Sequence, residues 1–213
     1  MKIWTNVGIW LFILLNLVTR GITALLEAVA APIFIAVWKG NPASSVQDSS
    51  NMFLILGNCN FCFIHVLGLI GLVMYVYVDN LTNLTSEYAL LAVSFATTGI
   101  GALFFINYDH NDLTIKLWQF LIGSLMIWSI SSPLTQTLVL SNFSKLLGTK
   151  ATGTLMGYMS AAASVGRIIF SLLSAMGHIE PFVVSSVLCF VSCGLLIGYK
   201  WKLQQLTGTR HVT

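Results

Sequence analysis

Four polar residues lie on one face of the first apolar segment of this chain. Asn16, Arg20, Thr23 and Glu27 are spaced by offsets of 4, 7 and 11 residues, which places them along one narrow stripe of an α-helix. An arginine can bind an anionic group, and a carboxyl group can pair with an arginine or carry a proton. Each charge costs about 2.5–3.5 kcal/mol at mid-membrane, so such residues face a cavity, a partner charge or a cargo. The stripe therefore predicts a polar path across a membrane.

Other polar residues are expected at similar depth. At a rise of 1.5 Å per residue, Arg20 lies about 16 Å, Arg167 about 22 Å and Glu27 about 27 Å from one membrane edge, and His65 is near mid-depth. The two arginines would bind an anionic group of a cargo, or exchange partners with Glu27, or form a fixed pair that locks two helices together. Glu27 or His65 could carry a proton. Asn58 and His65 share a face of their helix, where they line the same cavity or form an interhelical hydrogen bond.

The fourth apolar segment combines a proline with many hydroxyl groups. Pro133 removes a backbone donor, so we expect a kink there. Gln136 is a further candidate for the solute pathway. A kinked, hydroxyl-rich helix either gates a cavity or is a simple bend, and both interpretations stay open. The hydroxyl-bearing residues are Ser129, Ser131, Ser132, Thr135 and Thr137.

Small residues recur at helical spacing in the fifth apolar segment. Gly153, Gly157, Ala161 and Ser164 would form a smooth face that lets a neighbouring helix approach closely. Such close packing suits helices that slide during transport, and it suits static bundles as well. We therefore predict that Gly153, Gly157 and Ala161, together with Pro133, serve helix packing.

The elements that must position these residues are long apolar helices. Of the 213 residues, 56% are hydrophobic and only 8% are charged, whereas soluble domains have about 25% charged residues. The chain is therefore expected to lie in a lipid bilayer, as an all-α, polytopic protein with six transmembrane helices. The expected spans are Ile9–Ile35, Asn51–Val78, Glu87–Tyr108, Lys116–Leu140, Thr152–Met176 and Pro181–Trp201.

The charged residues between the spans predict an orientation. Six Lys and Arg residues fall on the side shared by both chain ends and two fall on the other side, so both termini are expected in the cytosol. Residues 1–201 would form one six-helix transmembrane domain, and residues 202–213 a loose, polar cytosolic tail.

Signals for other kinds of chemistry are weak. Cys59 and Cys62 have the spacing of redox or zinc sites, but no second ligand pair accompanies them, so helix packing is the favoured interpretation. We find no zinc-protease, serine-hydrolase or nucleotide-binding motif, and no basic run that would indicate nucleic-acid binding. We therefore expect neither catalytic residues nor a metal or other cofactor.

One stretch resembles a known family. It begins with Ser144-Lys-Leu-Leu-Gly, continues through Gly153-Thr-Leu-Met-Gly157 and ends in a small-residue run at Arg167. This stretch resembles the loop and eleventh helix of major facilitator transporters, in particular the branch that contains the lysosomal ceroid-lipofuscinosis and SPX-linked proteins. Leu26-Glu27 followed by Pro32 resembles the seventh helix of that branch.

The resemblance implies a function and a set of partners. It implies the C-terminal six-helix half of a major-facilitator bundle, which carries a small solute or ion across an endolysosomal membrane. Such carriers bind cargo between two halves, so the chain would pair with a second six-helix half or with a copy of itself. The alternative is a non-transporting membrane assembly subunit or a channel component.

Overall fold

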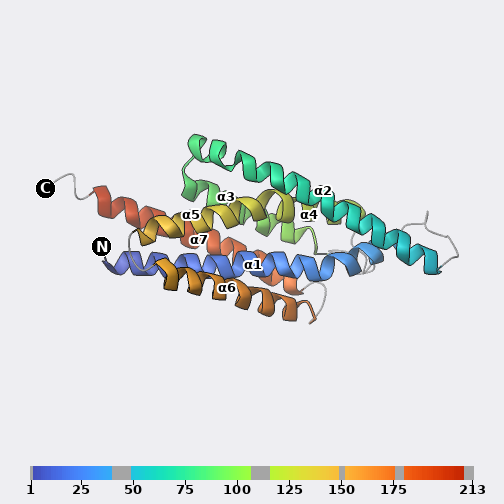
Figure 1. Cartoon of the computed structure of the whole chain (residues 1–213). Coiled ribbons are helices and arrows are strands. Elements are labelled where there is room, and N and C mark those ends of the chain that lie inside the picture. Colours follow the sequence, from blue (N-terminus) through green and yellow to red (C-terminus); the bar gives the residue numbers. More distant parts are fainter. Residues whose placement is uncertain (1, 40–48, 107–115, 149–151, 176–179, 209–213) are drawn as a thin grey trace.

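The computed structural model describes residues 2–39, 49–106, 116–148, 152–175 and 180–208, and these residues form an all-helical bundle (Figure 1). Leu117–Leu147 is one continuous helical stretch made of α4, η2 and α5. The elements are α1 (Lys2–Lys39), α2 (Ser49–Leu84), α3 (Glu87–Leu103), α4 (Leu117–Ser124), η2 (Leu125–Ser131), α5 (Ser132–Leu147), α6 (Thr152–Leu173) and α7 (Glu180–Gly208).

Five helical stretches within the described ranges are long and apolar enough to cross a membrane. This is the pattern of an integral membrane protein. The helix α3 is apolar but has only 17 residues, at the lower limit for a span. The five stretches are Val7–Ala30, His65–Leu84, Leu117–Leu147, Gly153–Leu173 and Glu180–Gln205.

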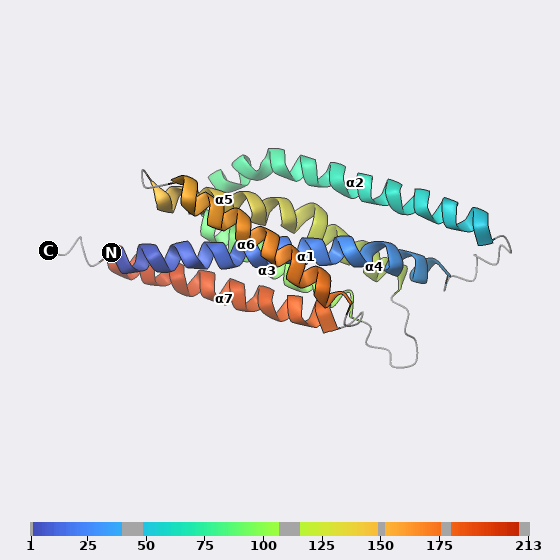
Figure 2. The ribbon, with the colours of Figure 1, turned by 60° about the horizontal axis from the view of Figure 1, so that its bottom comes forward.

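The helix α1 runs through the middle of the bundle, where it packs mainly along α6 and α5 (Figure 1). The helix α3 packs along α7, and α2 packs along η2 and α5. In both views α2 lies at an outer edge, while the start of α1 and the end of α7 lie at the same end of the bundle (Figure 2). The stretches His65–Leu84 of α2 and Gly153–Leu173 of α6 bury only a small part of their residues within the chain.

Aromatic side chains close one end of the bundle. Phe105 stacks on Phe182 of α7 with ring centroids 4.5 Å apart, and it meets Phe120 of α4 edge to face at 5.9 Å. Phe120 also contacts Phe34 of α1 and Phe63 of α2. These contacts join four helices to Phe105, the second residue after α3, in the stacked, tilted and edge-to-face arrangements that aromatic pairs adopt.

Hydroxyl groups join the helices in the middle of the bundle. Ser129 Oγ donates to the Leu67 carbonyl of α2 at 2.9 Å, and Ser131 Oγ donates to the Ser94 carbonyl of α3 at 2.8 Å. Ser132 Oγ lies 3.4 Å from Thr23 Oγ1 of α1. Three nearby serines of one helical stretch therefore bind three different helices.

The disturbance expected at Pro133 takes the form of a π-helical segment. The segment η2 ends just before Pro133, and the Ser132 N–H donates to the Ile127 carbonyl five residues back. Proline cannot donate to the helical ladder, and π-helical segments widen a helix locally. Pro133 itself is buried and packs close to Gly71 of α2, as its predicted role in packing requires.

Several predicted boundaries were wrong. Helix α1 already begins at Lys2, before the predicted Ile9, and α3 ends at Leu103, before the predicted Tyr108. Helix α2 continues to Leu84, α5 to Leu147 and α7 to Gly208, so residues 79–84, 141–147 and 202–208 are helical and are not loops or a loose tail. These stretches are polar, and polarity alone does not end a helix. Residues 141–147 and 202–208 contain Lys, Leu or Gln, which are good helix formers, so a helix readily continues there. In residues 79–84, which are mostly weak helix formers, Leu81 packs against the core.

Candidate functional site

A polar groove lies between α1, α5 and α6 and continues toward α2. Its deeper part is a cavity of about 360 Å³. Its second part, of about 590 Å³, shares Arg20, Gln136, Leu140 and Met156 with the first and adds Tyr75 of α2. The residues that line the deeper part are Asn16, Arg20, Gln136, Leu140, Met156, Met159, Ser160, Ala163, Ser164 and Arg167.

Close contact between α1 and α6 forms one wall of the groove. A Cβ at Gly166 would overlap the carbonyl oxygen of Leu17 and lie 3.0 Å from its carbonyl carbon. A Cβ at Gly21 would lie 2.7 Å from a ring carbon of Phe170. The two glycines therefore allow the helices to approach each other closely. Asn16 Nδ2 fixes the register by donating to the Met159 carbonyl at 2.8 Å.

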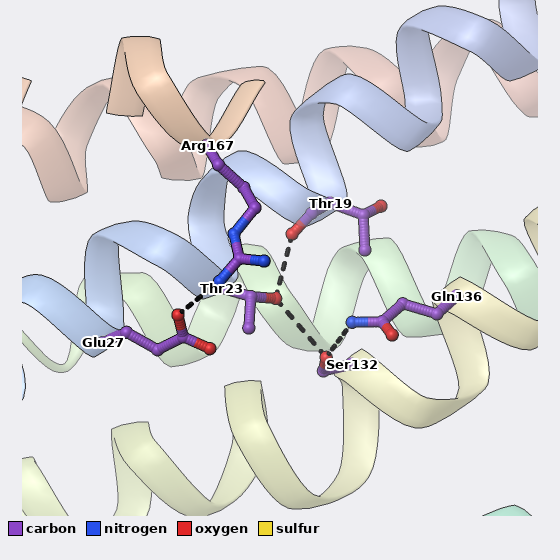
Figure 3. A network of polar contacts seen from close by, with 6 residues as sticks. All are labelled: Thr19, Thr23, Glu27, Ser132, Gln136 and Arg167. Atoms are coloured by element: carbon purple, nitrogen blue, oxygen red, sulfur yellow. Dashed lines mark hydrogen bonds and ion pairs between the residues drawn. The ribbon is translucent and has the colours of Figure 1, made fainter. Parts of the chain in front are cut away.

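This contact brings Arg167 of α6 to Glu27 of α1. Arg167 donates through Nη2 to Glu27 Oε2 at 3.1 Å, and the two side chains are 59% and 40% exposed (Figure 3). The depths expected from the sequence for these two residues differ by about one helical turn along the membrane normal. The pair can act as a fixed lock or as a contact that opens during a conformational change.

A chain of hydrogen bonds crosses the groove beside this pair (Figure 3). Thr23 Oγ1 of α1 donates to the Thr19 carbonyl at 3.0 Å and lies 3.4 Å from Ser132 Oγ. Gln136 Nε2 donates to Ser132 Oγ at 2.7 Å, and Gln136 Oε1 accepts from the Tyr75 hydroxyl at 3.3 Å. The chain links α1, α5 and α2, and it holds the Gln136 amide in one orientation.

Arg20 differs from the other cations of the site. Its side chain is exposed and lines both parts of the groove. Within the described part of the chain it makes no ion pair, whereas Arg167 pairs with Glu27. Among the described residues this guanidinium has no counter-ion, and it lies among helices long enough to span a membrane. It can therefore attract and bind an anion.

Several predicted pathway residues lie together at the groove. Asn16, Arg20, Gln136 and Arg167 line it, while Glu27 and Thr23 lie beside it through their bonds to Arg167 and Ser132. The sequence reasoning did not identify Tyr75, which lines the outer part. A tyrosine in an apolar helix has no distinctive signal until its neighbour, here Gln136, is known.

His65 is not brought to the groove. Its side chain is exposed on α2, and it is not among the residues that line either cavity. The buried face of α2 carries Leu67, Gly71 and Val78, and His65 lies on nearly the opposite side of that helix. Depth alone cannot tell which way a helix faces. The side chain of Asn58, the other candidate on this helix, lies outside the described residues.

The prediction for the small residues of α6 was wrong for contacts within this chain. Gly153, Gly157 and Ala161 are exposed, and a Cβ at either glycine would meet no atom within 4 Å. Helix α6 instead contacts α1 through Gly166 and Phe170, which lie on nearly the opposite side of α6. Small residues permit close packing, but they do not decide which face is packed.

Groups suited to metal binding or redox chemistry are not gathered in the described part of the chain. Three or more His, Cys, Asp or Glu side chains do not cluster anywhere in these ranges. Cys189 and Cys193 of α7 are free thiols. The side chains of Cys59 and Cys62 lie outside the described residues.

Comparisons of the chain with protein-family models, curated proteins and solved structures found no match. The groove therefore has to be interpreted from its own geometry and charge.

Proposed function

We propose that this protein is a transmembrane transporter, a carrier of the major-facilitator type that moves a small solute or ion by alternating access. The observation that supports this function most directly is the polar groove, which holds two arginines among helices long enough to cross a membrane. Its deeper cavity of about 360 Å³ is within the usual range for small-molecule sites.

The energetic argument concerns the burial of charge. Arg20, Arg167 and Glu27 lie within helical stretches of high hydropathy. If they faced lipid, each would cost several kcal/mol, whereas a water-filled groove removes most of that cost. The simplest role for such a groove is to admit a hydrophilic solute into the membrane.

The proposed topology has six spans, with the short α3 as the third. The start of α1 and the end of α7 lie at the same end of the bundle (Figure 1), which agrees with an even number of crossings. We place that end in the cytosol because of the excess of Lys and Arg there. The endolysosomal membrane is proposed from the family resemblance alone.

The open side of the groove suggests a partner. Arg20 and Arg167 are both exposed in the isolated chain, and α2 and α6 bury little of their surface. A second six-helix bundle, or a second copy of this chain, would cover the groove and complete a closed pathway. The pair between Glu27 and Arg167 joins α1 to α6, so it would open or close as the bundles rock against each other.

The test is transport by purified protein in liposomes. A panel of isotope-labelled small metabolites and ions is offered, and we expect saturable uptake of one solute or class. Arg20→Ala and Arg167→Ala should abolish uptake while the folded protein remains extractable. Lys145→Gln removes a charge outside the groove and should leave uptake intact. Normal uptake in both arginine variants would refute the assignment of the pathway.

The second candidate is a non-transporting assembly subunit or a channel component. The exposed groove and the exposed small-residue face of α6 favour it, because both could serve contacts with other chains. Absence of saturable uptake for every solute offered, together with stable co-purification of a membrane partner, would favour this candidate over a carrier.

A further inference from the structure

We infer that the groove binds a compact anion of charge −1 through Arg20, and that Glu27 competes with this anion for Arg167. The inference rests on the proposed function, because it names the class of solute for that same groove. It depends on three features of the described residues: the arginine that lacks a counter-ion, the net charge of the site and the hydrogen-bond donors that remain available.

The first feature is the unequal pairing of the two arginines. Arg167 already donates to Glu27 at 3.1 Å, whereas Arg20 makes no ion pair with any described residue. Both guanidinium groups line the same cavity. An anion that enters the cavity therefore meets Arg20 without having to displace anything, and reaches Arg167 only in exchange with Glu27.

The second feature is the charge count. The residues that line the cavity include two arginines and no acidic side chain, and Glu27 lies just beside them. With Glu27 ionised, the site has a net charge of one positive unit. An anion of charge −1 neutralises this charge, whereas a dianion would leave an excess negative charge in a membrane, which is unfavourable.

The third feature is the chemistry of the available donors. The Asn16 amide donates to Met159, and the Gln136 amide donates to Ser132 and accepts from Tyr75. Each of these two amides keeps a second N–H, and Ser160 adds a hydroxyl, but the cationic donors that line the cavity are the two guanidinium groups. Their planar fork suits two oxygens of one oxyanion. Carboxylates, sulfonates and phosphodiesters share this geometry and the charge of −1, so a free solute and a lipid headgroup are both chemically suitable.

The test measures binding to the full chain in lipid nanodiscs. Three tetrahedral probes of similar size differ in charge, because each step replaces a methyl group by an oxygen: dimethyl sulfone is neutral, methanesulfonate has charge −1 and sulfate has charge −2. Binding is followed by the ligand-dependent rise in the thermal unfolding midpoint. We expect methanesulfonate to bind about tenfold or more tightly than either of the other two probes.

Three variants separate the roles of the charges. Arg20→Gln should weaken methanesulfonate binding about tenfold or more. Glu27→Gln should tighten it and shift the preference toward sulfate, because the net charge of the site rises by one. Lys145→Gln removes a charge from the end of the bundle and should change neither affinity nor preference. Since Arg20 makes no ion pair with a described residue, its replacement should leave the unfolding midpoint without ligand unchanged.

Several results would overturn the inference. Equal binding of all three probes would rule out recognition by charge. Unchanged binding in Arg20→Gln would rule out Arg20 as the residue that binds the anion. If Glu27→Gln lowers stability without changing affinity, the pair with Arg167 is only a lock and Glu27 does not compete.

Lipid composition identifies the source of the anion. If discs of anionic lipid suppress methanesulfonate binding and Arg20→Gln abolishes the suppression, the lipid headgroup is the bound anion. That result would refute a soluble solute as the ligand of the groove. Equal binding in anionic and zwitterionic discs supports the soluble solute. Transport is not needed for any of these measurements, so binding without uptake would refute the carrier function alone, and uptake without charge-selective binding would refute this inference alone.

Discussion

The close crossing of α1 and α6 makes Gly166 the most sensitive position beside the groove. In Gly166→Ala, the new methyl group would overlap the Leu17 carbonyl oxygen and lie 3.0 Å from the carbonyl carbon. Both atoms belong to the backbone of a helix, so no side-chain rotation can relieve the overlap. The two helices must therefore separate by about 1 Å.

The expected loss of stability follows from two opposing effects. Overpacking of this kind costs about 1–3 kcal/mol, and a backbone obstacle places Gly166→Ala in the upper part of that range. Replacing glycine by alanine within a helix returns up to about 1 kcal/mol. We therefore expect the free energy of unfolding to fall by about 1–2 kcal/mol. Each kcal/mol should lower the unfolding midpoint by about 2–4 °C.

Gly157→Ala is the matched control, because it makes the same chemical change on the same helix. A Cβ at Gly157 would meet no atom within 4 Å, so only the gain in helix propensity remains. Thermal unfolding of the detergent-solubilised variants should show a lower midpoint for Gly166→Ala and an equal or higher midpoint for Gly157→Ala. Midpoints that move together in the same direction would refute the assigned contact between α1 and α6.

Two further variants test contacts elsewhere in the bundle. Ser131→Ala removes the hydrogen bond to the Ser94 carbonyl and the contact with Thr98, and should cost about 0.6–1.7 kcal/mol in thermal unfolding; a cost near zero would show that this serine does not hold η2 to α3. Lys145→Gln breaks an exposed ion pair with Glu87 and should cost less than about 1 kcal/mol, an effect that disappears in high salt.

Periodicity along one helix predicted much of the site. The offsets between Asn16, Arg20 and Glu27 depend only on helical geometry, so they could be read before any tertiary structure was known. Depth counting then placed Arg167 at a depth between Arg20 and Glu27, and the structure pairs it with Glu27 at 3.1 Å. The all-helical fold followed from composition and from the length of the apolar segments.

Contacts between helices could not be predicted in the same way. His65 has suitable depth and chemistry, but the rotation of α2 about its own axis places it away from the groove. Gly153 and Gly157 form the more regular small-residue pattern, yet Gly166 contacts α1. Both results depend on which side of a helix meets its neighbour, and a single sequence does not record that choice.

The three serines before Pro133 have a consequence for how the protein is assembled in the membrane. Ser129, Ser131 and Ser132 bind α2, α3 and α1, all of which are synthesised earlier than the helix that carries the serines. Until that helix has been inserted, the first three helices lack these cross-links and can still rotate and tilt in the lipid. Insertion of Leu117–Leu147 therefore adds cross-links to all three earlier helices in one step of biogenesis, and α6 and α7 add their contacts with α1 and α3 afterwards.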